Sequence, residues 1–213
     1  MTKVKVCGNT QPEDIKLAVE LGVDYLGFIF TESKRKVTLE QAKAMMQAAP
    51  NFKNYVGVFS NQPKQEVEFV ARKLGLKFLQ FHGEETARYC HYFMNHGFEV
   101  IKTFRIKDAR SLKRIDEYNV SYFLFDTYDE VQKGGTGRPF DWNLIEDRPY
   151  VHEKLFLSGG LNPENIKNAI KKIHPAVLDV SSGVELSPGK KDPLKMKEFI
   201  RVAKESSLAH ERT

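Results

Sequence analysis

The chain has 213 residues, of which 41% are hydrophobic and 29% are charged. This length suits one ordinary domain, or two small ones, and can bury a core large enough to fold without metals or crosslinks. The 15 Phe and 8 Tyr residues are too many for a disordered chain. We therefore expect a globular protein.

The net charge is +5, and the 33 Lys and Arg residues are scattered among 28 Asp and Glu. A nucleic-acid-binding protein would be expected to gather its positive charge in a stripe with interleaved aromatic residues. We therefore expect no nucleic acid partner. Scattered positive charge can instead draw in an anionic small molecule.

No targeting or membrane segment is expected. The first residues lack a long apolar run behind a basic end, and no stretch approaches the roughly 18 apolar residues of a membrane span. Cys7 and Cys90 are the only thiols, too few for a disulfide framework or a zinc site. These features predict a cytoplasmic protein with free thiols, no metal and no membrane partner.

Short apolar, β-branched or aromatic runs recur along the chain without polar alternation. Such runs are typical of strands buried on both faces of a parallel sheet. The eight candidate strands are Val4–Val6, Tyr25–Phe30, Tyr55–Phe59, Phe78–Phe81, Val100–Thr103, Tyr122–Phe125, Leu155–Leu157 and Val177–Val180.

Segments with helical spacing lie between these runs. Asn162 followed by Pro163 predicts a capped helix start, and Trp142–Ile145 allows one short helix at most. Residues 206–213 are expected to form a frayed tail. The predicted helices are Pro12–Leu21, Leu39–Ala48, Lys64–Leu74, Glu84–Asn95, Ala109–Tyr118, Pro163–Ile173 and Leu194–Ala203.

Strand and helix alternate from end to end, with strand starts about 22 to 32 residues apart, the length that a parallel crossover requires. This α/β pattern predicts a single (β/α)8 barrel, a TIM barrel, over residues 1–205. An open, doubly wound sheet is the alternative, because one sequence does not give the strand order. In both folds ligands bind just beyond the carboxyl ends of the strands.

Two residues at predicted strand ends suit proton transfer. Cys7 follows the first strand, either as a small buried hydrophobe or as a thiolate whose pKa nearby cations lower from about 8.5. Asp126 ends the sixth strand, where burial favours the protonated carboxyl that a general acid requires.

Other strand-end loops carry groups suited to binding. Arg35 lies in the cationic loop 31–36, which is either a solvated surface or a bidentate grip for a carboxylate or phosphate. Gln80 and His82 end the fourth strand, and His82 is either structural or in contact with a ligand. The loop 133–137 contains Gly134, Gly135 and Gly137 and is expected to move as a lid.

Small residues follow the last two predicted strands. Gly159 and Gly160 come after the seventh strand, and Ser182 and Gly183 come after the eighth. Small residues let backbone N–H groups approach an anion, and these two loops are the usual phosphate site of such barrels. We therefore expect a phosphorylated small-molecule substrate.

The ordered motifs of this chain resemble those of the phosphoribosylanthranilate isomerase family of tryptophan biosynthesis. The likeness covers all but the C-terminal tail. No single motif identifies the family, but the order and spacing of the motifs together do. The strings are KVKVCG at 3–8, GFIF at 27–30, SKR at 33–35, VGVF at 56–59, QFHG at 80–83, Asp126, GGTG at 134–137, FDW at 140–142, SGGLNPEN at 158–165 and DVSSGVE at 179–185.

The resemblance implies an Amadori rearrangement of N-(5-phosphoribosyl)anthranilate to 1-(2-carboxyphenylamino)-1-deoxyribulose 5-phosphate, without a cofactor. It implies that Cys7 is the general base, Asp126 the general acid and Arg35 the group that holds the anthranilate carboxylate. Asp179 would contact the ribose hydroxyls or support the site. The resemblance also implies that Gln80 and His82 bind substrate and that the Gly159–Gly160 and Ser182–Gly183 segments bind phosphate.

Three rival classes stay open at this point. Another phosphosugar barrel enzyme, such as indoleglycerol-phosphate synthase or a pentose-phosphate epimerase, would use the same phosphate site with other acids and bases. A sugar-phosphate-binding module without catalysis has no reason to place both Cys7 and Asp126 at strand ends. A nucleic-acid binder would lose affinity steeply with salt. Protein partners, oligomeric state and activity on a related aminoimidazole carboxamide ribonucleotide are also open.

Overall fold

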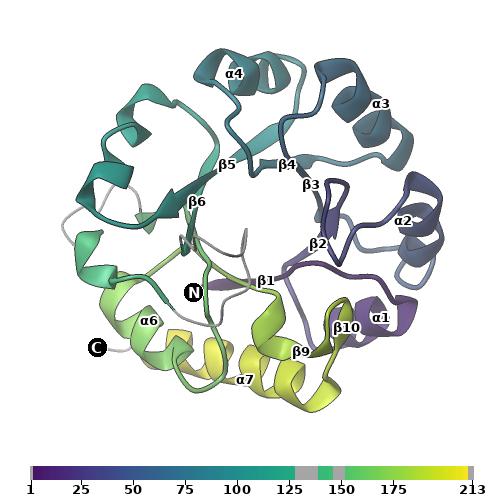
Figure 1. Cartoon of the computed structure of the whole chain (residues 1–213). Helices are drawn as coiled ribbons and strands as arrows, with labels where there is room; N and C mark the ends of the chain where they lie inside the picture. Colours follow the sequence, from purple (N-terminus) through teal and green to yellow (C-terminus); the bar gives the residue numbers. More distant parts are fainter. Residues whose placement is uncertain (1, 128–138, 146–151, 211–213) are drawn as a thin grey trace.

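The computed structural model describes residues 2–127, 139–145 and 152–210. Eight parallel strands form a closed barrel in chain order, and β8 pairs with β1 to close it. Figure 1 shows the helices in a ring outside the strands. The barrel prediction is confirmed, and the β8–β1 pairing rules out the open sheet. The strands are β1 Lys3–Val6, β2 Tyr25–Ile29, β3 Tyr55–Phe59, β4 Phe78–Phe81, β5 Glu99–Ile106, β6 Tyr122–Thr127, β7 Leu155–Leu157 and β8 Val177–Val180.

Most predicted helices are present with small changes at their ends. Thr38 and Gln41 form a reciprocal capping box at the start of α2, and the Thr86 hydroxyl accepts the backbone N–H of Tyr89 at the start of α4. None of the helices in the described ranges is long and apolar enough to cross a membrane. The helices are α1 Pro12–Glu20, α2 Leu39–Met46, α3 Lys64–Leu74, α4 Ala87–Asn95, α6 Ile166–Ile173 and α7 Pro193–His210.

The helix predicted over Ala109–Tyr118 is wrong. Two 3₁₀ turns occupy this segment, η1 Ala109–Leu112 and η2 Ile115–Glu117. The buried residues Leu112, Ile115 and Tyr118 recur every third position. This spacing matches the three residues per turn of a 3₁₀ helix, in which such side chains lie on one side.

Two other helix ends differ from the prediction. The helix expected from Pro163 begins at Ile166, because the Asn162 side chain accepts the backbone N–H groups of Glu164 and Asn165 and forms a turn there. At the other end of the chain, α7 continues through residues 206–210, which were expected to be frayed. Ser207 is buried, and its hydroxyl accepts the backbone N–H of Thr2 at 3.2 Å. The short helix expected within Trp142–Ile145 is η3 Trp142–Leu144.

Two apolar layers hold the barrel together. The larger layer packs the outer faces of the strands against the helices. The smaller layer fills one end of the barrel interior and consists of Tyr25, Val56, Phe78, Ile101, Leu124, Phe156 and Val177. We call this set the barrel plug. Because the plug closes one end, polar side chains that point inward gather toward the other end.

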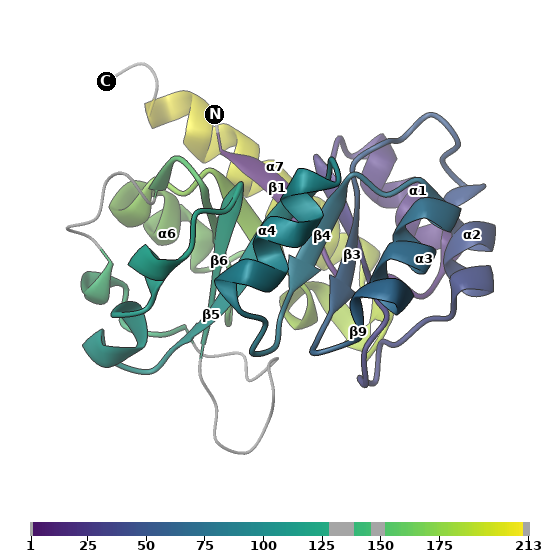
Figure 2. The same ribbon diagram turned by 90° about the horizontal axis from the view of Figure 1, so that it is seen from above.

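A short hairpin follows the last strand of the barrel. The turn η4 Ser182–Val184 leads into β9 Glu185–Ser187, which pairs with β10 Lys190–Lys191. Figure 2 shows that β1 begins, and α7 ends, on the side of the barrel opposite β9. The hairpin therefore lies at the end of the barrel toward which the strands run.

Candidate active site

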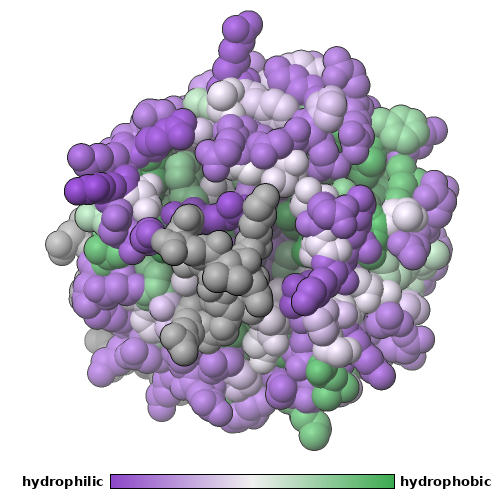
Figure 3. Space-filling view, viewed as in Figure 1, coloured by the Kyte–Doolittle hydropathy of each residue, from purple (hydrophilic) through white to green (hydrophobic). Residues whose placement is uncertain are grey.

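A cavity of about 730 Å³ opens at the carboxyl ends of the strands. Figure 3 shows that the face around it carries a largely hydrophilic rim. The cavity brings together the predicted site residues Cys7, Arg35, Gln80, His82, Asp126, Gly159, Gly160, Asp179, Ser182 and Gly183. The predicted lid glycines Gly134, Gly135 and Gly137 lie outside the described residues.

The Cys7 side chain lies directly beyond β1 and is only 7% exposed. Its backbone N–H donates to the Val180 carbonyl oxygen at 2.8 Å, which ties it to β8. Gly27 on β2 provides the room for the thiol, because a Cβ at that position would lie 2.6 Å from Sγ. The Cys7 backbone is therefore fixed to β8, and its thiol lies against the backbone of β2 at Gly27.

Burial raises the pKa of the Cys7 thiol, although the ammonium groups of Lys5 and Lys191 act in the opposite direction. Asp179 adds to the upward shift. One of the two interpretations from the sequence was a thiolate whose pKa nearby cations lower. The cations are present, but in this structure the loss of hydration outweighs them.

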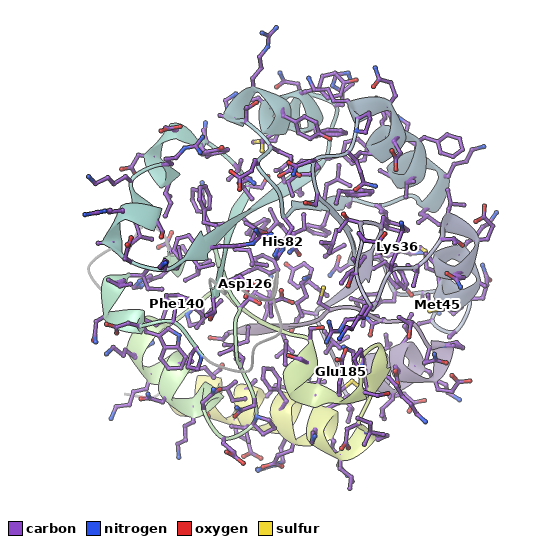
Figure 4. All side chains as sticks on the ribbon, in the orientation of Figure 1. Lys36, Met45, His82, Asp126, Phe140 and Glu185 are labelled. Carbon is purple, nitrogen blue, oxygen red and sulfur yellow. The ribbon has the colours of Figure 1, made fainter. Side chains whose placement is uncertain are left out.

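Asp126 lies in β6, and its carboxyl group faces the imidazole of His82. The distance from Asp126 Oδ2 to His82 Nε2 is 3.4 Å, while Oδ1 accepts the backbone N–H of Thr127 at 2.9 Å. Figure 4 shows His82 and Asp126 next to each other near the centre of the barrel opening. The Asp126 residue is 7% exposed, so its carboxyl group is nearly enclosed by protein.

A fully buried lysine forms the centre of the polar interior. Lys5 Nζ donates to Asp179 Oδ1 and to Gln80 Oε1, each at 2.9 Å. Burial lowers the pKa of Lys5, but the charge of Asp179 and the neighbouring Cys7 raise it above its ordinary value. Lys5 therefore remains a cation inside the barrel, directly beneath the cavity.

Arg35 binds a carboxylate of the protein itself. Its Nε donates to Glu185 Oε1 at 2.8 Å, and its Nη2 donates to Oε2 at 2.6 Å. Lys191 Nζ donates to the same Oε1 at 2.9 Å and to the Cys7 carbonyl oxygen at 2.6 Å. Gly8 makes room for the arginine, since a Cβ there would lie 2.6 Å from its Cδ.

Arg35 and Lys191 stabilise the charged form of the Glu185 carboxyl. Burial raises the pKa of the Glu185 carboxyl, but hydrogen bonding to Arg35 and the charge of Lys191 bring it below its ordinary value. Glu185 therefore stays a carboxylate. In the sequence Glu185 stands only at the end of the DVSSGVE motif, and no motif marks Lys191, because neither residue ends a strand of the barrel.

The loops after β7 and β8 pack directly on each other. Gly159 and Gly160 have positive φ values of 87° and 66°, which favour glycine. A Cβ on Gly183 would overlap the carbonyl oxygen of Leu161. Glycine is therefore required in both loops, at Gly183 for space and at Gly159 and Gly160 for backbone conformation.

Arg105 is a cavity residue that the strand pattern of the sequence does not predict. It pairs with Asp126 in the β5–β6 register, and its Nη2 donates to the His82 carbonyl oxygen at 3.2 Å. Within the described residues its Nε has no hydrogen-bond partner. The predicted strand stops at Thr103, whereas β5 runs on to Ile106 and includes Arg105.

An eight-stranded parallel barrel that gathers a thiol, a carboxyl group and cations around one cavity at the strand ends has the architecture of a TIM-barrel enzyme. Comparison with known proteins defines the family. Residues 4–202 match the family model described as N-(5'phosphoribosyl)anthranilate (PRA) isomerase. The chain belongs to this family, and it is an isomerase of tryptophan biosynthesis.

Individual relatives agree with this assignment. The chain is 44% identical over 207 residues to the N-(5'-phosphoribosyl)anthranilate isomerase of Pelobacter propionicus, covering 97% of both chains. It is 46% identical over 201 residues to that of Caldanaerobacter subterraneus, covering 94% of this chain and 97% of the relative. The crystal structure of the isomerase from Thermotoga maritima superimposes with a TM-score of 0.86 at 39% identity, covering 96% of this chain and 100% of that one. The resemblance read from the motifs is confirmed.

Proposed function

We propose that this protein converts N-(5'-phosphoribosyl)anthranilate to 1-(2-carboxyphenylamino)-1-deoxyribulose 5-phosphate, with Asp126 as general acid and Cys7 as general base. The observation that carries the proposal is that both residues, each 7% exposed and placed at the ends of different strands, line the same cavity. A related phosphoribosyl anthranilate isomerase, 38% identical to this chain, has been crystallised with reduced 1-(o-carboxyphenylamino)-1-deoxyribulose 5-phosphate. That complex supports a phosphorylated ligand of this kind.

In the first step, Asp126 transfers its proton to the ring oxygen of the ribofuranose. The bond between C1′ and the ring oxygen breaks, and the anilino nitrogen lone pair forms a C1′=N iminium. Asp126 is left as a carboxylate, next to the donor groups of Thr127 N–H and His82. A positioned acid of this type contributes about 10²- to 10⁴-fold to the rate.

In the second step, the Cys7 thiolate removes the proton at C2′. The iminium makes that proton acidic, so the C–H electron pair forms a C1′=C2′ double bond, the C1′=N π pair returns to nitrogen, and an enolamine results. In the ketonisation the Cys7 thiol returns its proton to C1′, the C2′ hydroxyl proton passes to the Asp126 carboxylate, and the C2′ carbonyl forms. The protons balance between substrate, Cys7 and Asp126, so the proposed reaction needs no cofactor.

The remaining groups are proposed to hold the substrate. Arg35 would bind the anthranilate carboxylate, using guanidinium N–H groups other than the two that Glu185 accepts. The loops that contain Gly159–Gly160 and Ser182–Gly183 would bind the phosphate through backbone N–H groups. Asp179 supports the site through Lys5 at 2.9 Å. Gly134, Gly135 and Gly137 remain a predicted lid.

The test of the proposal follows the loss of phosphoribosylanthranilate by its fluorescence. Cys7→Ser and Asp126→Asn should each lower kcat by at least about 10²-fold, the scale of losing a positioned acid or base. Circular dichroism controls for folding. Turnover close to that of the unmodified enzyme in either folded variant would remove that residue from the mechanism.

A second experiment separates the two proposed anion sites. Arg35→Ala should raise KM, while inorganic phosphate should still compete with the substrate, because the phosphate loops are distinct from the loop that carries Arg35. Loss of phosphate inhibition in Arg35→Ala would show that the two sites had been assigned wrongly.

A further inference from the structure

Four side chains form a continuous line across the barrel opening, from β1 to β6. Lys5 Nζ lies 2.9 Å from Gln80 Oε1, Gln80 Nε2 lies 3.1 Å from His82 Nδ1, and His82 Nε2 lies 3.4 Å from Asp126 Oδ2. Lys5 is 0% exposed and Gln80 is 2% exposed. Water therefore has little access to the first two members of the line.

The lysine determines the orientation of the Gln80 amide. A lysine ammonium only donates hydrogen bonds, so the atom of Gln80 that faces it has to be the carbonyl oxygen. The amide nitrogen then points to the opposite side, where it faces His82 Nδ1 and, at 3.4 Å, the Thr103 hydroxyl. Turning the amide over would set its N–H groups against the Lys5 ammonium, which is costly in a buried site.

The Gln80 amide in turn determines the protonation of His82. Because Gln80 Nε2 donates, His82 Nδ1 accepts with its lone pair, and a neutral imidazole then carries its hydrogen on Nε2. That hydrogen points toward Asp126 Oδ2. An imidazolium, with hydrogens on both nitrogens, would direct Nδ1–H against the N–H groups of Gln80.

The tautomer matters for the direction of proton transfer. With hydrogen on Nε2, His82 offers Asp126 a donor, and Thr127 N–H offers another at Oδ1. The acidic proton of Asp126 is then left for the substrate oxygen. In the other tautomer, the bare Nε2 would accept that proton and compete with the substrate.

We propose that Lys5 and Gln80 are positioning residues that hold His82 in the Nε2–H tautomer, so that His82 donates toward Asp126 and never accepts its proton. This inference rests on the proposed role of Asp126 as general acid. During the reaction the proton passes from Asp126 to the ring oxygen, the carboxylate that remains faces the His82 Nε2–H, and His82 neither gains nor loses a proton.

The primary test is ¹⁵N NMR of the full-length enzyme with labelled histidines, at a mildly alkaline pH where an ordinary imidazole is neutral. The His82 signal, identified by its loss in His82→Asn, should show the Nε2–H tautomer. A His82 signal typical of the Nδ1–H tautomer or of imidazolium would overturn the proposal. The tautomer is read in the unmodified enzyme, and His82→Asn serves only to assign the signal.

A reversal of the hydrogen-bond direction provides the second test. In Gln80→Glu the side chain keeps its length, but both oxygens accept, so one accepts from Lys5 and the other from His82 Nδ1–H. The His82 signal should move to an Nδ1-protonated form, and kcat should fall at least about 10-fold, part of what a positioned acid contributes. An unchanged His82 signal, or a switched tautomer with unchanged kcat, would contradict the inference.

Thr103→Val is the matched control. It removes the long 3.4 Å contact to Gln80 in the same part of the barrel and leaves the Lys5–Gln80 bond in place. Its His82 tautomer and kcat should stay close to those of the unmodified enzyme. His91, whose Nε2 faces the Asn119 carbonyl oxygen, should keep its signal in every variant.

The experiments distinguish a failure of the inference about Lys5 and Gln80 from a failure of the proposed function. If Asp126→Asn retained turnover, Asp126 would not be the acid, whatever tautomer the NMR spectrum showed. If Asp126→Asn lost turnover but His82 carried its hydrogen on Nδ1, the proposed function would stand and the positioning role of Lys5 and Gln80 would be wrong.

Discussion

At the scale of single residues, the two cysteines of the chain differ in their surroundings, and only Cys7 is placed to take part in the chemistry. Cys7 borders the cavity, whereas Cys90 lies in α4 and is 0% exposed. Burial raises the pKa of both thiols, and that of Cys90 rises to about 12. A cation, Lys102, also lies near Cys90, so the difference between the two thiols is access from the cavity, which chemical modification measures.

The first prediction concerns the pH dependence of alkylation. A raised pKa means that little Cys7 thiolate is present at neutral pH, and the thiolate fraction grows as the pH rises. The rate of Cys7 alkylation by iodoacetamide, followed by mass spectrometry, should therefore still be rising above the ordinary thiol pKa of about 8.5. Cys90 in the same native protein should stay unlabelled. A Cys7 rate that levels off near neutral pH would contradict the raised pKa.

A second residue-scale prediction concerns the space that Gly27 leaves for the thiol. Gly27→Ala would place a methyl group 2.6 Å from Cys7 Sγ, so the thiol has to move. Because a small displacement of a reacting group costs up to about 10²-fold in rate, kcat should fall by at least about 10-fold. Assays of kcat alongside thermal unfolding measure both effects.

Gly57→Ala is the control for Gly27→Ala. Gly57 lies on the neighbouring strand, in register with Phe28, and its added methyl group would meet Leu76 and Phe59 instead of the thiol. Both variants should lose stability, but only Gly27→Ala should lose kcat. Equal loss of kcat in the two variants would mean that general destabilisation, and not the position of Cys7, is responsible.

At the scale of elements, the hairpin β9–β10 completes the site from outside the barrel. Glu185 begins β9 and Lys191 ends β10, so the hairpin places a carboxylate and an ammonium beside the loop that carries Arg35. The Lys191 ammonium also donates to the Cys7 carbonyl oxygen at 2.6 Å. The hairpin therefore ties the Arg35 loop to the end of β1.

The third prediction tests this arrangement with Glu185→Gln. The change keeps the shape of the side chain but leaves the buried Lys191 ammonium without its carboxylate, a loss on the order of 3 kcal/mol of unfolding free energy. Arg35 loses its fixed position, so KM should rise more than kcat falls. Steady-state kinetics and urea unfolding provide the two measurements.

Glu32→Gln is the control for Glu185→Gln. The pair that Glu32 makes with Lys36, at 3.3 Å, is exposed to solvent on both sides. Exposed pairs contribute little, because water screens them and two flexible side chains have to be ordered. KM and stability should therefore stay unchanged in Glu32→Gln, and Glu185→Gln behaving the same way would remove the hairpin from the site.

At the scale of the whole molecule, the barrel plug separates stability from function. The plug fills one end of the interior, while the proposed acid and base lie at the other end. Phe156 is 0% exposed, and its ring centroid lies 5.3 Å from the rings of both Tyr25 and Tyr122. A change in the plug should therefore act on folding before it acts on catalysis.

The fourth prediction is that Phe156→Ala lowers the free energy of unfolding by about 3–5 kcal/mol, the usual cost of a large cavity in an apolar core. The folded fraction should keep a kcat near that of the unmodified enzyme. Phe69→Ala, at a phenylalanine that is 58% exposed on α3, should change stability by less than about 0.5 kcal/mol. A large loss of kcat in folded Phe156→Ala would show that the plug also positions the site.

The site was only partly predictable from the sequence. Cys7, Asp126, Arg35 and the glycines after β7 and β8 stand at strand or loop positions that a parallel barrel directs to one end, so their grouping followed from the pattern. Arg105 was missed because the predicted strand stops at Thr103, whereas β5 runs on through Phe104, Arg105 and Ile106. The helix expected over Ala109–Tyr118 was wrong, since its apolar residues recur at a spacing that both kinds of helix permit.

The sequence by itself determined the strand and helix order, the family and the residues at the strand ends, because these depend on periodicity and motifs that are local in the chain. Only the tertiary structure decided the closure of β8 on β1, the pairing of Arg35 with Glu185 and the line from Lys5 to Asp126. Lys5 and Asp179 are 174 positions apart, yet their charged atoms lie 2.9 Å from each other. Hydration, charge and hydrogen-bond direction in the site depend on such contacts, and closing the barrel is what creates them.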